Sequence, residues 1–287
     1  MIKTIKSYGK TLISLCVISL SKTRVGSYFF EQVFKIAMQA TKRISHKNVN
    51  LTFCVPNQLN RFRVDTFATK EPETLEWIET IPQGSTFWDI GANIGLYSLY
   101  AARARGCSVY AFEPSVFNLE LLARNIHMNG LTEQVIIVPC PLSNRLAVNT
   151  LNMTSTEWGG ALSTFGQEYG WDGLPITQIF AFKTIGISAD DAVNFLHLPS
   201  PDYIKIDVDG IEHLILNGGM SILKTVKGIL IEINDNFYEQ ASSCHQMLSE
   251  AGLVLQAKLH SEMFDLEGAF GDAKVWNQIW RREHPSV

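Results

Sequence analysis

The sequence predicts an α/β protein built around a mostly parallel β-sheet, and two observations carry this prediction. From residue 85 onward, short apolar segments typical of buried strands alternate with amphipathic segments typical of helices. Such a pattern indicates a sheet that helices cover on both faces, a three-layer sandwich. The composition agrees, because 46% of the 287 residues are hydrophobic and only 18% are charged, which suffices for a large core.

The expected elements follow one another in a regular order. Before residue 85, alternating segments at 51–56 and 61–68 predict strands, and Pro72 predicts the start of a helix. Predicted helices after residue 85 lie at 94–104, at 115–130, from about 210, and up to about 251. The predicted strands of the sheet lie at 86–90, 108–113, 134–139, 203–207, 228–234, 253–259 and 275–282.

Charge and cysteine content narrow the class of partner and the compartment. The net charge is −4, so we expect no nucleic-acid partner and no bulk attraction of the whole chain to an anionic surface. The five cysteines are scattered and form no C-x-x-C pair, which suits reduced thiols in a cytoplasmic protein without a structural zinc site. These cysteines are Cys16, Cys54, Cys107, Cys140 and Cys244.

Residues 1–48 are predicted as a helical extension of a domain at 49–287. Its apolar run, TLISLCVISL, has the outline of a signal peptide but no A-x-A cleavage site. The run is also shorter than the roughly 20 apolar residues that span a bilayer. Three interpretations stay open: a helix buried against the domain, a peripheral contact with the inner face of the membrane, and secretion. The basic flank of a membrane contact would be Lys3, Lys6, Lys10, Lys22 and Arg24.

The turn after the first strand of the sheet reads DIGANIG, and its glycines have unusual spacing for a phosphate site. A dinucleotide fingerprint, G-x-G-x-x-G, needs a middle glycine for close approach to a pyrophosphate. Here Gly91 and Gly95 are four residues apart, and Asn93 occupies the middle. Asp89 at the lip of the turn would repel a phosphate but attract an ammonium or sulfonium group.

The second strand ends in Phe112, Glu113 and Pro114, which adds an acid beside the first. An acidic side chain at this place can accept both hydroxyl groups of a ribose. Acids at two adjacent strand ends suit an adenosyl ligand that lacks phosphate. The combination indicates S-adenosylmethionine, although a strand, turn and helix with two glycines can also be simple architecture.

Four blocks of sequence carry a resemblance to a known family. They read DIGANIGLYSLYAA, VYAFEPSVFNLELLARNIHMNGL, IKIDVDGIEHLILNGG and LIEIN, and they lie in this order within residues 50–260. Together they resemble the FkbM family of S-adenosylmethionine-dependent methyltransferases. The resemblance implies a class I, Rossmann-like fold with a seven-stranded sheet whose last strand is antiparallel. It also implies O-methylation of a hydroxyl group.

The resemblance further implies which residues bind the cofactor. Residues of the first turn would line its methionine part, and Glu113 would hold the ribose. Leu142 and Ser143 would face the adenine, where Asn144 departs from the acid often found in the family. Glu71 is included from the lead-in TKEPETLEWIETIP, which is similar to that of bacterial members. The full predicted set is Glu71, Asp89, Gly91, Ala92, Asn93, Gly95, Glu113, Pro114, Leu142 and Ser143.

The fourth and fifth strand ends supply the candidate catalytic residues, Asp207, Glu232, His213 and Lys205. Asp207 is the first choice for the base that accepts the acceptor's proton or for the group that orients the acceptor. A lysine and a glutamate on buried strands are costly unless paired, so we expect an ion pair between Lys205 and Glu232, either structural or catalytic. His213, in the first turn of a helix, is expected to be neutral.

Other acids near these strand ends have alternative interpretations. Asp209 and Glu212 have the D-x-x-E spacing of a helix capping box, which is a structural role. No metal is predicted, although Asp207 with Asn234 or Asp235 could hold a divalent ion, as in some other O-methyltransferases.

The sequence also suggests a class of acceptor and leaves two alternative functions open. The segment MTSTEWGGALSTFGQEYGWDGLP is predicted as a substrate-facing flap whose aromatic residues either stack on a sugar or pack the flap. Bacterial relatives of the family suggest a glycan or polyketide hydroxyl. The alternatives are a nicotinamide-dependent oxidoreductase, disfavoured by the missing glycine, and a non-catalytic glycan-binding protein that retains the fold. No oligomeric state is predicted.

Overall fold

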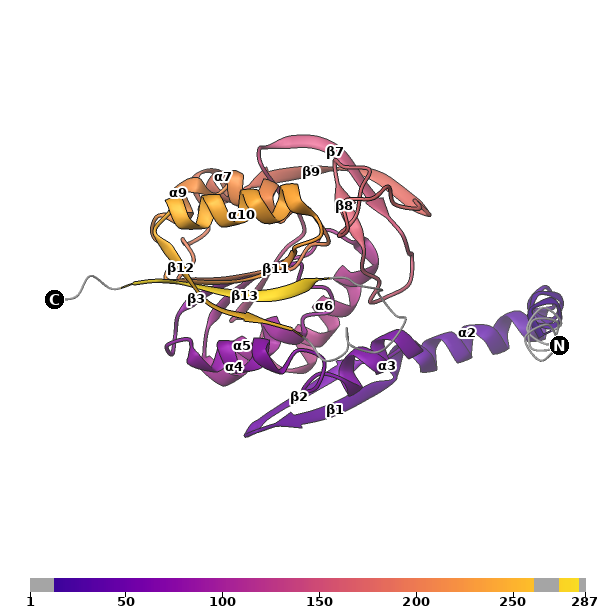
Figure 1. Cartoon of the computed structure of the whole chain (residues 1–287). Helices are drawn as coiled ribbons and strands as arrows, with labels where there is room; N and C mark the ends of the chain where they lie inside the picture. Colours follow the sequence, from indigo (N-terminus) through magenta and orange to yellow (C-terminus); the bar gives the residue numbers. More distant parts are fainter. Residues whose placement is uncertain (1–12, 261–273, 284–287) are drawn as a thin grey trace.

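The computed structural model describes residues 13–260 and 274–283 and contains the predicted sheet (Figure 1). Seven strands pair in the order β12, β13, β11, β10, β3, β4, β5. β13 runs antiparallel to β11 and β12, whereas the other neighbouring pairs are parallel. The class I prediction is therefore confirmed, including its antiparallel last strand. The strands are β3 (Thr86–Ile90), β4 (Ser108–Phe112), β5 (Val135–Val138), β10 (Tyr203–Ile206), β11 (Gly228–Asn234), β12 (Leu253–Leu259) and β13 (Val275–Arg282).

Helices cover both faces of this sheet because its strands are apolar on both sides. Phe87 and Trp88, neighbours on β3, are fully buried in two different cores, one on each face. One face carries α4 (Pro72–Thr80), α5 (Leu96–Arg105) and α6 (Val116–Met128) (Figure 1). The other carries α7 (Ala189–Leu196), α8 (Glu212–Asn217), α9 (Met220–Leu223) and α10 (Tyr238–Glu250).

A second sheet, which the sequence did not predict, lies between β5 and β10 in the chain. Its four strands pair in the order β6, β9, β7, β8. They are β6 (Leu142–Ser143), β7 (Ala147–Met153), β8 (Ser163–Phe165) and β9 (Phe180–Ser188). Phe165 and Leu151 of this sheet are buried in the same core as Trp88. The segment predicted as a flap thus contains β8 and contributes to the packed core.

The strand predicted at 61–68 is wrong, because these residues belong to α3 (Gln58–Asp65) and the turn after it. Asn57 caps the helix, accepting the backbone N–H of Asn60 at 2.8 Å. The buried side chains in this region are Asn60, Val64 and Phe67, which share one face at helical spacing. The buried residues therefore follow the period of a helix, although the sequence alternates between apolar and polar residues as a strand does.

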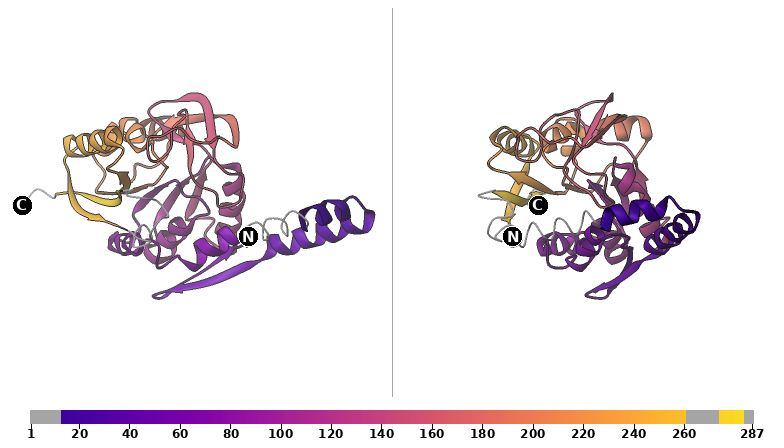
Figure 2. Two further views of the ribbon diagram at one scale, coloured as in Figure 1. Left: turned by 45° about the vertical axis from the view of Figure 1, so that its right-hand side comes forward. Right: turned by 90° about the vertical axis from the view of Figure 1, so that its right-hand side faces the viewer.

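The start of the chain forms a helical arm followed by a β-hairpin. Residues 13–21 are helical, and α2 (Arg24–Gln39) follows a turn. β1 (Thr41–His46) then pairs with β2 (Val49–Cys54), so the hairpin crosses the predicted boundary at residue 48. Figures 1 and 2 show α2 projecting from the body, and of its residues only Gly26 and Met38 are buried. The described part of the arm is thus not a helix buried against the domain.

The structure describes part of the segment on which the membrane interpretation depends. Within the described ranges, no helix has the length and apolarity to cross a membrane. Lys3, Lys6 and Lys10 of the predicted basic flank lie outside the described residues. Lys22 and Arg24 are exposed at the turn between the two helical segments.

Candidate active site

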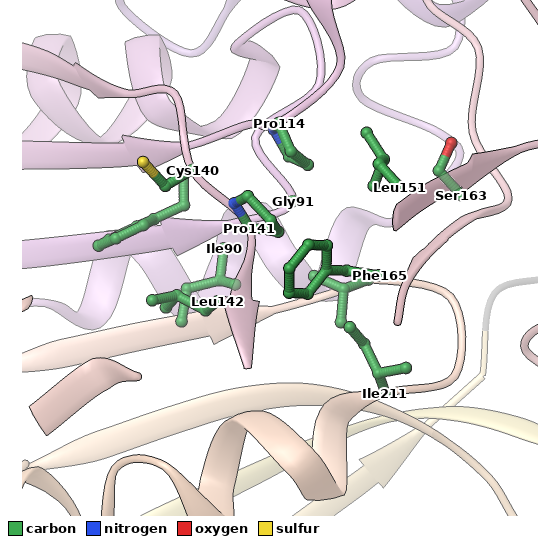
Figure 3. A pocket seen from close by; sticks show the side chains of 12 residues that line it. Ile90, Gly91, Pro114, Cys140, Pro141, Leu142, Leu151, Ser163, Phe165 and Ile211 are labelled. Atoms are coloured by element: carbon green, nitrogen blue, oxygen red, sulfur yellow. The ribbon is translucent and has the colours of Figure 1, made fainter. Parts of the chain in front are cut away.

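An apolar pocket opens where the carboxyl ends of β3, β4 and β5 meet, the place at which ligands bind in such sheets (Figure 3). Its wall includes Gly91, Pro114 and Leu142 of the predicted cofactor set. The second sheet closes the pocket from the other side, a contribution that no sequence signal revealed. The lining residues are Ile90, Gly91, Phe112, Pro114, Cys140, Pro141, Leu142, Leu151, Ser163, Phe165, Val208 and Ile211.

Gly91 is the residue at which the first turn touches the end of β10. Its φ is +86°, and a Cβ atom built there would lie 1.9 Å from the backbone oxygen of Asp207. Neither the conformation nor the contact tolerates a side chain. The backbone N–H groups of Gly91 and Ala92 both donate to the carbonyl of Phe112, at 3.0 Å. The glycine therefore allows the ends of three strands to converge on one point.

Asn93 and Gly95 complete the turn. Asn93 adopts a φ of +51°, and its amide group donates to the carbonyl of Gly160 at 2.9 Å. Gly95, with a φ of +88°, precedes α5 and lies against Leu122 and Leu99, which leave no room for a Cβ atom. The side chain of Asn93 thus anchors the loop at residues 158–160 above the turn, a role that the sequence did not indicate.

Asp89 is a buried carboxylate with one unsatisfied oxygen. Its Oδ2 accepts a hydrogen bond from the Ser98 hydroxyl at 2.5 Å, while its Oδ1 has no partner among the described residues. Burial raises the pKa of Asp89, and the nearby charge of Lys205 opposes this shift. A buried oxygen without a hydrogen-bond donor is costly, and although Lys205 supplies a nearby positive charge, Oδ1 can still accept a hydrogen bond from a ligand.

Glu113 is also buried and organises the turns on both sides of it. Its two oxygens accept the backbone N–H groups of Asn93 at 2.8 Å and Ser115 at 2.7 Å. Burial raises the pKa of Glu113 to about 7, and these hydrogen bonds act in the opposite direction. Each carboxylate oxygen can accept a further hydrogen bond, so the group retains capacity for hydroxyl donors.

Two other members of the predicted cofactor set, Ser143 and Glu71, lie away from the turn that follows β3. Ser143 is buried beside Leu142 on β6, within the second sheet. Glu71 precedes α4, where it pairs with Lys70 at 2.6 Å and accepts the hydroxyl of Tyr97 at 2.9 Å. Glu71 therefore lies beside Lys70 and Tyr97, on the α4 and α5 side of the sheet, and does not line the apolar pocket.

The ion pair predicted between Lys205 and Glu232 is wrong, because Lys205 pairs with its own strand neighbour. Its Nζ lies 2.9 Å from Oδ2 of Asp207 and 5.1 Å from the centre of the Tyr97 ring. Asp89 is directly opposite Lys205 on the adjacent strand. The buried lysine is thus shared between two carboxylates, which raise its pKa although burial opposes the shift.

The remaining catalytic candidates differ in their electrostatic environment. Burial raises the pKa of Asp207, but the stronger combined attraction of Lys205 and Lys70 holds it below the ordinary value. Glu232 has the opposite outcome: burial, together with the charges of Asp207 and Glu71, places its pKa well above the ordinary value. His213 is half-buried, its Nδ1 has no partner among the described residues, and desolvation lowers its pKa. This direction favours the neutral form of His213, as expected, and its cause is desolvation.

The capping box predicted from Asp209 and Glu212 is wrong, because α8 begins at Glu212 and Asp209 does not cap it. Glu212 accepts the backbone N–H groups of Gly210 and Val208, whereas the acid of a capping box would accept that of Asp209. Asp209 instead adopts a φ of +62° and accepts the N–H of Leu162, 47 residues away. Burial and the charge of Asp207 raise the pKa of Asp209 to about 6. The motif thus connects the fourth strand end to the loop before β8.

The alternative metal ligands are engaged elsewhere. Asn234 donates to the carbonyl of Trp171 at 3.1 Å, and Asp235 pairs with Lys258 at 2.5 Å. The part of the chain that the structure describes holds no group of three or more His, Cys, Asp or Glu side chains suited to a metal ion.

This fold and these strand ends define the class as a Rossmann-like methyltransferase, and comparison with known proteins gives the family. The model of the methyltransferase FkbM domain matches residues 89–257. The chain therefore belongs to the FkbM methyltransferase family, whose methyl donor is S-adenosylmethionine. Family membership favours methyl transfer over the nicotinamide-dependent alternative.

Two curated relatives are methyltransferases. The hexuronic acid methyltransferase AglP of Haloferax volcanii is 23% identical over 188 residues, which cover 61% of this chain and 66% of the relative. The methyltransferase sdnD of Sordaria araneosa is 36% identical over 78 residues, 27% of this chain and 29% of the relative. The chain thus matches less than two thirds of the length of each relative.

Two solved structures that align with this chain illustrate the structural comparison. An FkbM methyltransferase from Methylobacillus flagellatus KT aligns with a TM-score of 0.45 at 13% identity, covering 87% of this chain and 58% of that one. The TYW2 protein of P. horikoshii, solved with MeSAdo, aligns with a TM-score of 0.45 at 13% identity, covering 84% and 69%.

Proposed function

We propose that the protein transfers a methyl group from S-adenosylmethionine to a hydroxyl group of a glycan or related small molecule. The observation that carries the proposal is that two adjacent strands each end in a buried acid, Asp89 and Glu113, beside an apolar pocket. The relationship to a hexuronic acid methyltransferase supports a carbohydrate acceptor in preference to a polyketide.

The residues fit the cofactor in two ways. The unsatisfied Oδ1 of Asp89 is suited to a positively charged group, and the apolar side chains that line the pocket beside Gly91 would pack against the adenine. Gly91 stands between the two environments, since it lines the pocket and contacts the backbone of Asp207. Glu113 would accept ribose hydroxyls, while Pro114, Leu142 and Ser143 would surround the adenine.

When bound, S-adenosylmethionine supplies an electrophilic methyl group, so the protein must align the acceptor oxygen and exclude water. Asp207 is ionised and partly exposed, with 30% of its side chain accessible, and would orient the acceptor hydroxyl by accepting its hydrogen bond. Lys205 would hold Asp207 in place. Glu232, whose raised pKa makes it the stronger base once ionised, would accept the proton, with His213 as the second candidate.

The loop and strands from residue 153 to 175 would form the acceptor side of the site. Asn93 fixes the loop to the turn after β3, which we call the cofactor turn. Asp209 fixes the same loop to the end of β10. Tyr169 packs against Phe237 with ring centres 5.4 Å apart, so this aromatic residue supports the segment. Trp171, on the same segment, would offer its ring to a sugar.

We place this reaction in the cytoplasm, with a peripheral contact to the inner face of the membrane through the N-terminal residues. The exposed arm and its basic residues support this contact.

The test of the proposed activity uses S-adenosylmethionine labelled in its methyl group. The protein is incubated with fractionated cell glycans, and label is sought in a carbohydrate fraction, where mild base distinguishes methyl esters from base-stable methyl ethers. A labelled ether supports O-methylation of a hydroxyl. Label in an ester, in a non-carbohydrate fraction or in no product would contradict the proposal.

A further inference from the structure

The N-terminal arm exposes a continuous apolar surface that the site does not use. On α2, Val25, Phe29, Val33 and Ile36 recur at helical spacing and lie on one side of the helix. Their exposed fractions are 81%, 54%, 44% and 69%. We refer to these four residues as the arm stripe. Apolar surface that gathers on one side of a projecting element is typical of an interaction site rather than of ordinary solvent-facing surface.

The helical segment before α2 extends this apolar surface. Residues 13–21 are exposed along their whole length and carry no charged side chain. The backbone of this segment approaches α2 closely, since a Cβ atom on Gly26 would lie 1.9 Å from the carbonyl oxygen of Leu20. The two helical segments therefore form one folded arm (Figure 2). Its exposed apolar residues before α2 are Ile13, Leu15, Val17, Ile18 and Leu20.

The charge of this part of the chain is opposite to that of the rest. Residues 1–40 contain six Lys or Arg and one acid, Glu31. The whole chain has 24 basic and 28 acidic residues, which leaves 18 basic and 27 acidic residues beyond position 40. A cationic, apolar arm on an anionic body is suited to a surface that is both anionic and apolar. A second copy of the same arm would instead bring like charges together.

From these observations we propose that the arm docks on the surface of an anionic phospholipid bilayer, with the arm stripe in the interface and Lys22 and Arg24 among the lipid phosphates. This inference deepens the proposed peripheral contact and is independent of the proposed acceptor. Apolar burial supplies binding to the lipid, and the basic residues supply preference for anionic headgroups.

The arm is connected to the candidate active site by a direct contact. The ring of Phe34, on α2, lies with its centre 5.9 Å from that of Trp158. Residue 158 begins the loop whose Gly160 carbonyl accepts the Asn93 side chain in the cofactor turn. A docked arm would therefore hold the acceptor side of the site close to the bilayer surface.

The test is flotation of the full-length protein with vesicles of phosphatidylcholine, alone or mixed with phosphatidylglycerol. We expect binding to the mixed vesicles, release by high salt, and at least about 10-fold weaker binding to phosphatidylcholine alone. Failure to float with the mixed vesicles, or equal binding to both compositions, would overturn the proposal.

Two matched variants separate the arm stripe from general charge. Phe29→Asp places an acid in the stripe and should weaken binding to the mixed vesicles by at least about 10-fold. Ser27→Asp adds the same charge at an exposed position on the opposite side of α2 and should retain most of the binding. Equal binding by the two variants would contradict a role for the stripe.

Two further measurements distinguish lipid binding from self-association and from the proposed activity. If sedimentation shows a wild-type dimer that becomes a monomer in Phe29→Asp, and neither protein floats, a second copy covers the arm and the proposal is wrong. Binding of S-adenosylmethionine is measured on the same proteins, and we expect Phe29→Asp to retain it. A wild-type protein that floats but binds no S-adenosylmethionine would contradict the proposed activity and leave the lipid proposal supported.

Discussion

Lys205 and Asp207 form an ion pair of 2.9 Å in which the lysine side chain is 2% exposed and the carboxylate 30% exposed. The lysine is thus enclosed by the protein, whereas the carboxylate remains partly accessible. Because Lys205 holds the pKa of Asp207 below its ordinary value, Asp207 is an acceptor of hydrogen bonds at neutral pH.

Asp207→Asn should lower the rate of methyl transfer by about 100-fold or more, the usual range for loss of a proton-transfer or positioning group. The asparagine keeps the shape but removes the charge that pairs with Lys205. Binding of S-adenosylmethionine should persist, which calorimetry can check on the same preparation. A folded variant that binds the cofactor and turns over at the wild-type rate would contradict this role.

Glu232 gives the pH dependence of the reaction a defined direction. Its pKa is raised well above the ordinary value, so it accepts a proton only above that raised value. The rate should therefore rise with pH, and Glu232→Gln should lower it and flatten the profile on its acidic side. Rates measured across neutral pH test this, with His213→Gln as the comparison. If the histidine variant alone flattens the profile, His213 is the base.

Substitution of glycine should have very different effects at two positions with positive φ. At Gly91 a methyl group would meet the backbone of Asp207, whereas at Gly84, with a φ of +76°, nothing lies within 4 Å. Gly84→Ala should cost only about 1 to 2 kcal/mol of unfolding free energy, the strain of a left-handed residue. Gly91→Ala should cost more and abolish cofactor binding. Urea unfolding and calorimetry measure the two effects, and equal losses would contradict the described turn.

The unfolding free energy of the cofactor-free protein should depend on pH because Glu113 titrates. Its pKa is about 7 in the folded protein against an ordinary value of 4.5, so the folded state holds this proton more tightly than the unfolded state. Stability from this group is present at low pH and is lost as pH rises from about 4.5 to 7. Relative to Glu113→Gln, the wild-type unfolding free energy should fall by about 1.4 kcal/mol per pH unit in this range.

Urea unfolding of both proteins at several pH values provides this comparison. Groups that titrate in both proteins cancel in the difference, so the difference reports Glu113. If this difference in unfolding free energy is constant with pH, burial does not raise the pKa of Glu113.

Much of the fold and part of the site could be predicted from local sequence. The strands of the main sheet are short apolar runs bounded by turns, and this pattern predicts their positions. Gly91 and Gly95 were recognisable from the turn, and Asp89 and Glu113 from their positions at strand ends. These features depend on neighbours in the chain.

The features that sequence did not reveal depend on distant partners. Lys205 could have paired with either adjacent carboxylate, and only the packed geometry selects Asp207. Asp209 has the spacing of a cap, yet its partner is Leu162, 47 residues away. The second sheet was missed because its strands carry little alternation, and β7 pairs with β9 across about 30 residues of chain. The anchoring role of Asn93 likewise requires knowledge of where Gly160 lies.

Calorimetric titration of the full-length protein with S-adenosylmethionine tests the central claim most directly. We predict micromolar binding to the wild type, loss of binding in Asp89→Asn and in Glu113→Gln, and unchanged binding in Glu120→Gln, whose exposed carboxylate pairs only with Arg124 among the described residues. Tight binding of NADH with no response to S-adenosylmethionine, or wild-type affinity in both strand-end variants, would contradict the account.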